Sequence, residues 1–191
     1  MRQCVGEYIE NLGLQRGLSQ ADIARDIRVP RQSLSYVICG KRELSLVLAL
    51  KLESYFSLPE GELMKMQVLQ SIQQRKTLIK KELCDKLLQN NAFWSYDLSS
   101  HEDIPDAELI EKCFMLLDME DIDRMFEIYP RKFIFNIWKE RMAIQGDYLL
   151  RLNIMIAMYY FDIKEPEKFI ARVERQHINK LTNDARIDKE H

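Results

Sequence analysis

Between residues 19 and 42 the sequence predicts two very short helices, and this spacing constrains the fold more than any other feature. Ser19-Gln20-Ala21-Asp22 places a hydroxyl three residues before an acid, the pattern of a capping box at a helix start. The helix predicted over 20–27 has only about two turns. Pro30 follows at once, and proline is accommodated in the first turn of a helix but not in its middle. The next helix, 31–39, ends at Gly40.

Apolar spacing predicts further helices around this pair. One runs from Val5 to Leu14 and is stopped by Gly17, another covers 44–56, and a fifth covers 60–75. Ala24 is small enough to let the two short helices approach each other. The side chains expected in the apolar seam between them are Ile23, Ile27, Val29, Leu34 and Val37, and the core candidates of the fourth helix are Leu46, Leu50 and Leu52.

Two brief helices joined by three or four residues, the second followed by Lys41 and Arg42, have helix-turn-helix geometry. The stretch L-S-Q-A-D-I-A-R-D-I-R-V-P-R-Q-S-L-S-Y-V-I-C-G-K-R-E-L resembles the Xre/phage-repressor family. In particular it resembles the HigA-type antitoxin branch, the plasmid maintenance system antidote proteins. The resemblance covers residues 4–75. It implies a lambda-repressor-like five-helix domain that binds double-stranded operator DNA, a homodimer, an autoregulated operon and a toxin partner.

The predicted DNA-binding residues fall into three groups. Gln pairs with adenine and Arg with guanine in the major groove, which suits the exposed face of the second short helix; this face carries Arg31, Gln32, Ser33, Ser35 and Tyr36. Ser19 and Gln20 begin the first short helix, where Gln20 is placed to hold a phosphate, as its counterpart does in the relatives. Lys41 and Arg42 suit the DNA backbone. The alternative is that Arg31 and Gln32 are merely solvated.

Arg28 departs from the family pattern. The relatives usually carry glycine at this turn position, which tends to adopt a positive φ, and arginine there costs about 1 kcal/mol unless the turn is remodelled. Alternatively, Arg28 adds a positive charge near the DNA backbone. Residues 25–42 hold five bases and one acid, so they form a basic patch in a chain of net charge −2.

The remainder of the chain reads as a connecting helix and aromatic junction (76–98), a helical domain (99–182) and a polar tail (183–191). The connecting helix, 73–89, carries Leu78, Leu83 and Leu87 on one side. The cluster Phe93-Trp94-x-Tyr96 either anchors the junction or binds a partner. We expect Asp147 to cap a helix that is apolar nearly all round and central in the bundle. The last helix is marked by Phe169, Ile170, Val173 and Leu181.

Residues 118–141, D-M-E-D-I-D-R-M-F-E-I-Y-P-R-K-F-I-F-N-I-W-K-E-R, resemble an uncharacterised helical module seen beside toxin–antitoxin genes, some with nucleotidyltransferase-type toxins. The acids Asp118, Glu120, Asp121 and Asp123 could hold a cation. Without the glycine and closing glutamate of an EF-hand, a solvated helix start is favoured.

The sequence predicts neither an enzyme nor a cofactor or metal site. It contains no P-loop, no GxSxG and no Cys–His pattern for zinc, and we expect His177 to be a half-buried structural histidine. Cys4, Cys39, Cys84 and Cys113 are far apart and are expected to be buried or half-buried thiols in a reducing cytoplasm. The longest apolar run, 149–161, is interrupted by Arg151 and Asn153 and is too short to span a bilayer.

Taken together, these patterns predict an all-α, cytoplasmic repressor of the antitoxin type. Residues 1–75 hold ten Lys or Arg against eight Asp or Glu, whereas residues 101–191 hold fourteen against nineteen. The acidic half would bind a partner, plausibly a basic toxin. Two rival hypotheses are a stand-alone Xre-type regulator whose second half dimerises or senses a ligand, and an interaction protein whose helix-turn-helix no longer reads DNA.

Overall fold

The computed structural model describes residues 4–92 and 104–187, and side chains as far as Thr182. Within these ranges the chain is helical and contains no strand, so the all-α prediction is confirmed. The aromatic cluster at 93–96, residues 99–103 of the predicted helical domain, and residues 188–191 of the predicted tail lie outside the described residues. None of the described helices has the length and apolar character needed to cross a membrane.

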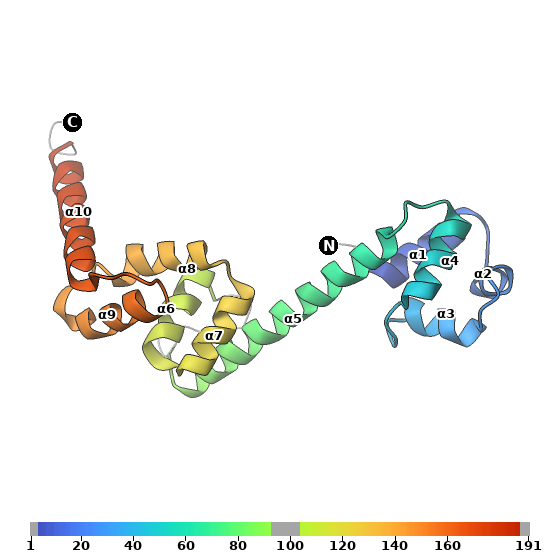
Figure 1. The fold of residues 1–191 in the computed structure, drawn as a ribbon, viewed down its shortest axis with the longest axis horizontal. Coiled ribbons are helices and arrows are strands. Elements are labelled where there is room, and N and C mark those ends of the chain that lie inside the picture. Colours follow the sequence, from blue (N-terminus) through green and yellow to red (C-terminus); the bar gives the residue numbers. More distant parts are fainter. Residues whose placement is uncertain (1–3, 93–103, 188–191) are drawn as a thin grey trace. The chain divides into compact units, whose positions relative to one another are not determined.

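Five helices begin the chain (Figure 1): α1 (Val5–Gln15), α2 (Gln20–Asp26), α3 (Arg31–Ile38), α4 (Leu46–Phe56) and α5 (Glu62–Gln89). In three of these helices a side chain caps the N-terminus. Cys4 and Ser19 each form a capping box, with Glu7 and Asp22 respectively, and the Ser45 hydroxyl accepts from the backbone N–H of Leu48.

The seam predicted between α2 and α3 is present. Ile23, Ala24 and Leu34 are almost fully buried, together with Ile9 of α1 and Leu52 of α4. The prediction for α4 was wrong at two positions, because Leu46 is 60% exposed and Leu50 42% exposed. Leu48, Ala49 and Leu52 lie on the buried side of α4. Leu46 and Leu50 are each two positions from a buried residue, which places them on the solvent side of the helix.

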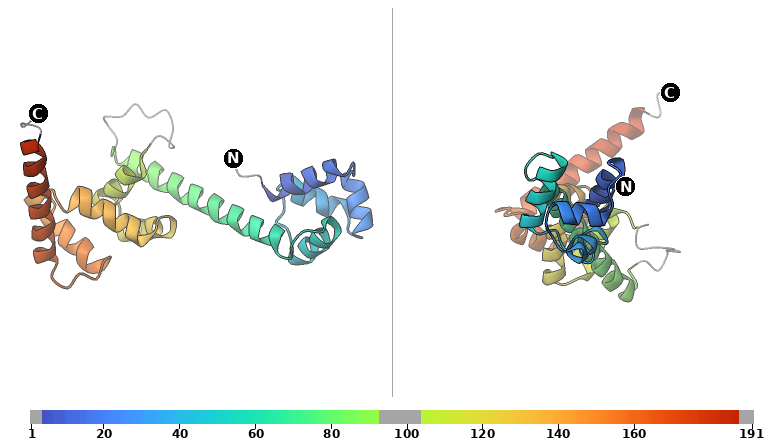
Figure 2. Two further views of the ribbon diagram at one scale, coloured as in Figure 1. Left: turned by 90° about the horizontal axis from the view of Figure 1, so that it is seen from above. Right: turned by 90° about the vertical axis from the view of Figure 1, so that its right-hand side faces the viewer.

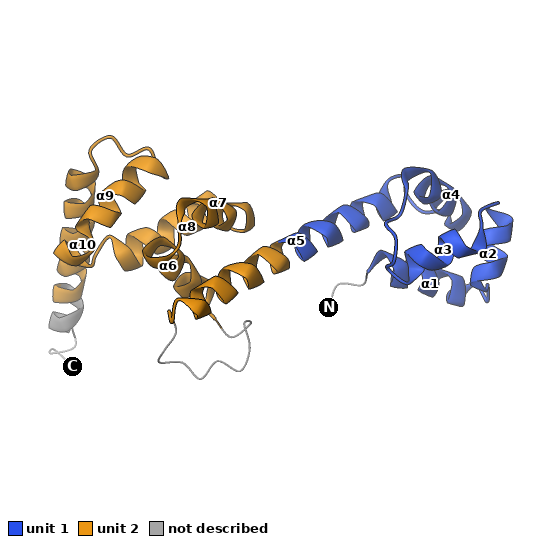
Figure 3. Ribbon diagram, turned by 90° about the horizontal axis from the view of Figure 1, so that it is seen from below, with its two compact units in different colours: residues 1–75 blue, residues 76–191 orange. Residues whose placement is uncertain are grey.

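The fifth helix differs most from its prediction. Residues 60–75 and 73–89 were expected as successive helices, but α5 is one helix of 28 residues. Residues 1–75 and 76–191 form two compact units, here called unit 1 and unit 2, and α5 contributes to both (Figure 3). In unit 2, Ile79, Leu83 and Leu87 are buried, whereas Leu78 is 48% exposed, contrary to prediction.

Unit 2 continues with α6 (Asp106–Leu116), α7 (Met119–Ile128) and α8 (Arg131–Ile137), which runs on into a π-helical turn, η2 (Trp138–Met142). A 3-10 turn, η3 (Gly146–Tyr148), precedes α9 (Leu150–Tyr159) and the long α10 (Pro166–Ile187), visible from two directions in Figure 2. Because α10 extends to Ile187, it continues into the segment expected to be a polar tail.

A buried polar group ties η2 to α9. The Asn153 amide accepts from Trp138 Nε1 at 2.9 Å and donates to the Met142 carbonyl at 2.9 Å. Around Trp138 lie the rings of Phe135, Phe161 and Phe169, with centroids 5.1–6.0 Å away. Aromatic rings therefore pack around Trp138 at the edge of a core that is otherwise mainly aliphatic.

Three expectations for unit 2 were wrong. The start of α9 is Leu150, and Asp147 lies in η3 instead of capping the helix. Nor is α9 buried all round, because Met158 and Tyr159 are 57% and 59% exposed. In α10, Leu181 is 55% exposed, since only the first turns of this helix pack on the core.

The acids at the start of α7 also differ from expectation. Asp118 caps the helix, but Asp121 is buried instead of solvated and accepts from Lys86 Nζ of α5 at 2.5 and 2.7 Å. The hydrogen bond to Asp121 raises the pKa of Lys86. Asp118 and Asp121 thus serve capping and packing, whereas Glu120 and Asp123 are exposed, as expected of a solvated helix start. The expectation of buried or half-buried thiols is confirmed for Cys84, Cys113 and Cys4 and is wrong for Cys39, which is exposed.

Candidate nucleic-acid interface

The turn between α2 and α3 is set by local hydrogen bonds. The backbone N–H of Val29 donates to Ala24 O at 2.9 Å, and that of Arg28 donates to Arg25 O at 3.1 Å. This pattern, with a left-handed residue between, is a Schellman cap. Arg28 is that residue, with φ of 53°, so the positive φ expected here is confirmed. The turn therefore has the left-handed conformation that the resemblance led us to expect, with arginine at that position.

A lysine from α4 fixes this turn from outside. Lys51 Nζ donates to Ile27 O at 3.1 Å and to Arg28 O at 3.3 Å. Both carbonyls lie just after the last turn of α2, where a cation also interacts favourably with the helix dipole. The contact holds the turn at a defined place relative to α4, which helps the chain to tolerate a strained arginine there.

The recognition helix α3 buries one side and exposes the other. Leu34, Val37 and Ile38 are buried. The opposite side carries the predicted readout residues: Arg31, Gln32 and Tyr36 are exposed, and Ser35 is half-buried. Gln32 Nε2 donates to Tyr36 Oη at 2.7 Å, one helical turn away. This bond orients the Gln32 amide, so the face is partly ordered before any ligand arrives.

On the side of α3 opposite this face, α1 lies very close to the end of the helix. A β-carbon on Gly6 of α1 would lie 2.3 Å from the Ile38 carbonyl oxygen, well inside van der Waals contact. Only glycine therefore allows α1 to pack against the end of α3. The loop after α3 is fixed from α5, where the Gln67 amide accepts from Leu44 N at 2.5 Å and donates to Leu44 O at 3.1 Å.

The start of α2 is already occupied by hydrogen bonds within the chain. Ser19 Oγ donates to Asp22 Oδ2 at 2.6 Å and accepts from Asp22 N at 3.2 Å. Hydrogen bonds that the Asp22 carboxylate accepts from the Ser19 hydroxyl, from the Ser19 backbone N–H and from Arg25 lower the pKa of Asp22. Gln20 Nε2 donates one of its two hydrogens to Glu10 Oε1 at 3.3 Å, which leaves the other hydrogen available for a phosphate.

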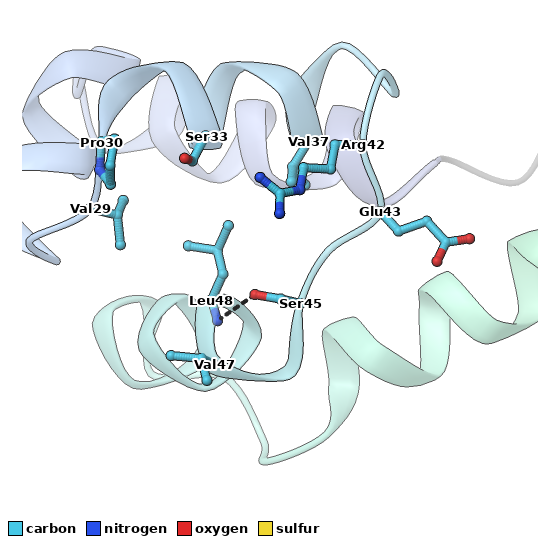
Figure 4. Close-up of a pocket in the computed structure, with 9 residues that line it drawn as sticks. All are labelled: Val29, Pro30, Ser33, Val37, Arg42, Glu43, Ser45, Val47 and Leu48. Carbon is cyan, nitrogen blue, oxygen red and sulfur yellow. Dashed lines mark hydrogen bonds between the residues drawn. The ribbon is translucent and has the colours of Figure 1, made fainter.

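Beyond α3 the chain forms a groove with a volume of about 220 Å³ (Figure 4). Ser33 and Val37 of α3 face Val47 and Leu48 of α4 across it, and Arg42 lies at one end. Ser33 thus lies at the side of the predicted readout face, toward the groove. Lys41 and Arg42 are both exposed in the loop that follows α3.

Three exposed or positioning residues of this region were not among the predicted DNA-binding residues, although Arg25 was counted in the basic patch. Cys39 is exposed and lies seven residues after Gln32, which is the spacing of a continued helix face. Arg25 is exposed beside the turn, with 71% of its side chain accessible. Helical spacing could have identified both. For the third, Lys51, no local pattern was available, because its role depends on how α4 packs against the turn.

Comparison with protein families identifies this region. Residues 10–63 match the family model HTH_3, described as helix-turn-helix. The search of curated proteins and the search of solved structures each found no match. The matched residues run from α1 to the start of α5 and include the Arg28 turn and α3. This chain therefore contains a helix-turn-helix domain of the Xre-like kind, the DNA-binding domain of sequence-specific transcription regulators.

Proposed function

We propose that this protein is a transcriptional repressor that binds operator DNA as a homodimer and acts as the antitoxin of a toxin–antitoxin operon. The observation that carries the proposal is the polar face of α3, which is free of packing and flanked by bases in a helix-turn-helix domain. The exposed Lys41 and Arg42 lie at its end. The antitoxin role rests on the resemblance of residues 4–75 to that branch of the family.

Docking α3 in the major groove assigns its side chains distinct tasks. In this motif the first residues of the recognition helix reach the base edges. Arg31 and Gln32 are those residues, suited to guanine and adenine, and each good bidentate contact contributes about 1–3 kcal/mol of discrimination. Two such helices in a dimer would read half-sites about one helical turn, ~34 Å, apart.

Lys41, Arg42 and Arg28 would contact phosphates, which carry no sequence information. Each neutralised phosphate steepens the fall of affinity with salt by about 0.9 in the logarithmic slope. We therefore expect removal of Lys41 to weaken operator and random DNA alike. Removal of Arg31 and Gln32 should weaken operator binding more than binding to random DNA.

Fluorescence anisotropy with DNA from upstream of the protein's own gene tests this assignment. The wild type is compared with Arg31→Ala/Gln32→Ala across a range of salt concentrations. A matched control, Arg175→Ala/Gln176→Ala, removes the same two residue types from adjacent exposed positions on α10. We expect nanomolar binding by the wild type and the control, and a loss of about 100-fold on operator DNA for the α3 variant.

Weak binding by the wild type that the α3 variant leaves unchanged would contradict the repressor assignment. Equal losses for the α3 variant and the control would also contradict it, because they would indicate a purely electrostatic, sequence-independent contact.

Unit 2 offers a surface for the proposed toxin partner. Along α9 and the turn before it, one outward stripe carries Tyr148, Met155, Met158 and Tyr159, all exposed. Methionine and tyrosine are enriched at protein interfaces, and methionine adapts to irregular partners. The unit as a whole is acidic, which would speed its encounter with a basic protein.

Expression of the gene neighbouring that of this protein tests the antitoxin role. We expect growth to stop when the neighbour is expressed alone and to resume when this protein is added. Met155→Gln/Met158→Gln should abolish rescue, whereas Ile178→Gln/Leu181→Gln, a matched pair of exposed apolar side chains on α10, should preserve it. A neighbour that is harmless alone excludes the antitoxin role.

A stand-alone regulator is the second candidate, favoured by a different observation. An open groove of about 420 Å³ at the start of α10 is lined by apolar Ile163 and Phe169, by the bases Lys164, Lys168 and Arg172, and by Glu165. Glu165 pairs with Lys168 at 2.5 Å, so Lys164 and Arg172 are the bases that would meet a small anionic effector with an apolar part. Release of operator DNA by such a molecule, in the absence of any second protein, would favour this candidate over the antitoxin.

A further inference from the structure

Gln32 and Tyr36 form a hydrogen bond on the exposed side of α3. Gln32 Nε2 donates to Tyr36 Oη at 2.7 Å. The two residues are four positions apart, which places their side chains one above the other on the same side of the helix. Tyr36 is 40% exposed, and Gln32 is exposed as well. Because water can satisfy both groups there, the bond contributes little to folding, and its consequence lies in how it arranges the two side chains.

The backbone under Tyr36 is fixed by the end of α3. The Tyr36 carbonyl accepts from the backbone N–H of Lys41 at 2.8 Å and from that of Arg42 at 3.1 Å. Gly40, with φ of 67°, makes the left-handed turn that this kind of helix end requires. The Tyr36 ring therefore projects from a fixed turn, from which its hydroxyl can hold the Gln32 amide in one orientation.

The hydrogen bond decides which groups of the Gln32 amide remain free. A glutamine amide has one oxygen and two N–H donors. One donor is used on Tyr36, so the oxygen and one N–H are left for a ligand. This pair matches adenine in the major groove, where N6 donates and N7 accepts. Guanine presents two acceptors there, O6 and N7, and offers no donor to the amide oxygen.

We propose that Tyr36 is a positioning residue that acts through Gln32 and sets the preference of that side chain for adenine over guanine. This rests on the proposed function, in which α3 reads operator DNA. Tyr36 also orders the Gln32 side chain before DNA arrives, so less side-chain freedom is lost on binding. Without the Tyr36 hydroxyl the amide is free to turn, and it can then direct either N–H to the acceptors of guanine.

Direct contact with DNA is the other role open to Tyr36, since its ring is 40% exposed. The hydrogen bond favours the positioning role, because it already engages the Tyr36 oxygen with Gln32. The two roles differ in a measurable way. A hydroxyl that acts through Gln32 has no effect once Gln32 is absent, whereas a hydroxyl that touches DNA keeps its effect.

Selection from a pool of DNA duplexes with about 20 random base pairs, enough for two half-sites, tests the base preference. The full-length wild type, Tyr36→Phe and Gln32→Ala each select from the pool, and the base pair read by Gln32 is the one whose preference Gln32→Ala abolishes. At this base pair we expect adenine in the wild-type selection. In the Tyr36→Phe selection we expect the preference for adenine over guanine to fall about tenfold, with the other positions unchanged. The control Tyr148→Phe removes a hydroxyl from an 81% exposed ring of unit 2 and should select the wild-type sequence.

Fluorescence anisotropy on the selected duplex completes the test with Tyr36→Phe, Gln32→Ala and the double variant. We expect Tyr36→Phe to weaken binding about tenfold and to cause no further loss in the Gln32→Ala background. Circular dichroism melting verifies that every variant folds like the wild type, as expected when only an exposed polar group is removed.

Three results would overturn the role of Tyr36 and leave the repressor function standing. These are an unchanged preference for adenine in Tyr36→Phe, guanine in the wild-type selection at the base pair read by Gln32, and a further loss in the double variant. The second would mean that the amide is held the other way round, with Tyr36 donating to its oxygen. A wild type that selects no sequence at all would instead overturn the repressor function, and the role of Tyr36 with it.

Discussion

In unit 1, the contacts that join helices run from side chains to the ends of other helices. Glu53 of α4 accepts from the backbone N–H groups of Gly61 and Leu63 at 2.9 and 2.8 Å, and Arg16 donates to the Tyr55 and Phe56 carbonyls at 3.1 and 2.7 Å. In unit 2 the corresponding task falls to aromatic rings around Trp138 and to ion pairs such as Lys86–Asp121.

Helix length does not separate the two units, because α2 in unit 1 and α8 in unit 2 each have seven residues. In unit 1 distant side chains satisfy backbone groups at helix ends: Lys51 at the end of α2, Arg16 at the end of α4 and Glu53 at the start of α5. Unit 2 buries three large aromatic side chains, Phe114, Trp138 and Tyr160, among aliphatic ones.

Replacement of Trp138 by alanine should give the largest effect on this comparison. It removes a fully buried ring and leaves the Asn153 amide oxygen without its donor, so we expect a loss of about 3–5 kcal/mol in unit 2. Calorimetry measures this loss, and the affinity for operator DNA should change little. Tyr148→Ala, at an 81% exposed ring, is the control. A loss below about 1 kcal/mol for Trp138→Ala would contradict the role of the rings.

A methyl group at Gly6 should destabilise unit 1 by about 2–3 kcal/mol, because its β-carbon would meet the Ile38 carbonyl oxygen at 2.3 Å. Gly13→Ala is the matched control in the same helix; there the nearest atom, Ile23 Cδ1 at 2.9 Å, belongs to a side chain that can move. Thermal melting followed by circular dichroism compares the two. Equal stability would show that α1 can shift along α3 without cost.

Glu53→Gln tests capping directly. Glutamine keeps one acceptor oxygen but places an NH₂ group against a backbone N–H, so we expect a loss of about 1–2 kcal/mol. Urea unfolding measures this loss of stability. The control is Glu60→Gln, at an exposed acid in the loop between α4 and α5. Indistinguishable midpoints for the two variants would remove side-chain capping as an explanation for unit 1.

Arg28→Gly should stabilise unit 1 by about 1 kcal/mol, because glycine adopts φ of 53° without strain. Arg28→Ala removes the same charge but keeps the β-carbon, so any difference in melting between the two variants reports the backbone alone. Both should lose the same small amount of DNA affinity. If the glycine and alanine variants melt at the same temperature, backbone strain at residue 28 has no measurable cost, and the Lys51 hydrogen bonds are what stabilise the turn.

The smallest effect concerns pH. Burial disfavours ionisation of Asp106, but hydrogen bonds from Lys80 and Tyr129, at 2.6 Å each, outweigh it and lower the pKa below 3.8. The ionised carboxylate therefore stabilises unit 2 above about pH 4, and this contribution is lost as the pH falls through the folded value. Asp106→Asn should cost less than about 1 kcal/mol at pH 7, since the pair is partly exposed, and nothing at low pH. Urea unfolding at several pH values checks this, with Asp162→Asn as the exposed control.

Several local features could be predicted because neighbours in the chain decide them. The Ser19–Asp22 capping box, the stop at Gly40 and the positive φ of Arg28 all depend on residues within one or two turns. The buried seam of α2 and α3 followed from its helical spacing in the same way. The exposed face of α3 could be predicted for the same reason, because it is the side of the helix opposite the buried one.

Burial of individual apolar side chains could not be predicted to the same degree. Leu50 and Leu52 are the same residue type two positions apart in α4, yet one is 42% exposed and the other fully buried. Met158 looked like a core residue and is 57% exposed, whereas Asp121 looked solvated and is buried against Lys86. Composition alone carries no information on which side of a helix meets a neighbour when both sides are apolar.

The sequence by itself thus determined the short pair of helices, their ends and the turn between them, because capping and backbone preference act over a few residues. Tertiary structure alone decided that α5 is one helix shared by two units, that Lys51 and Gln67 fix the surroundings of α3, and that Leu69 and Ile72 stay exposed. These outcomes depend on contacts between residues far apart in the chain, where packing and charge pairing outweigh local preference.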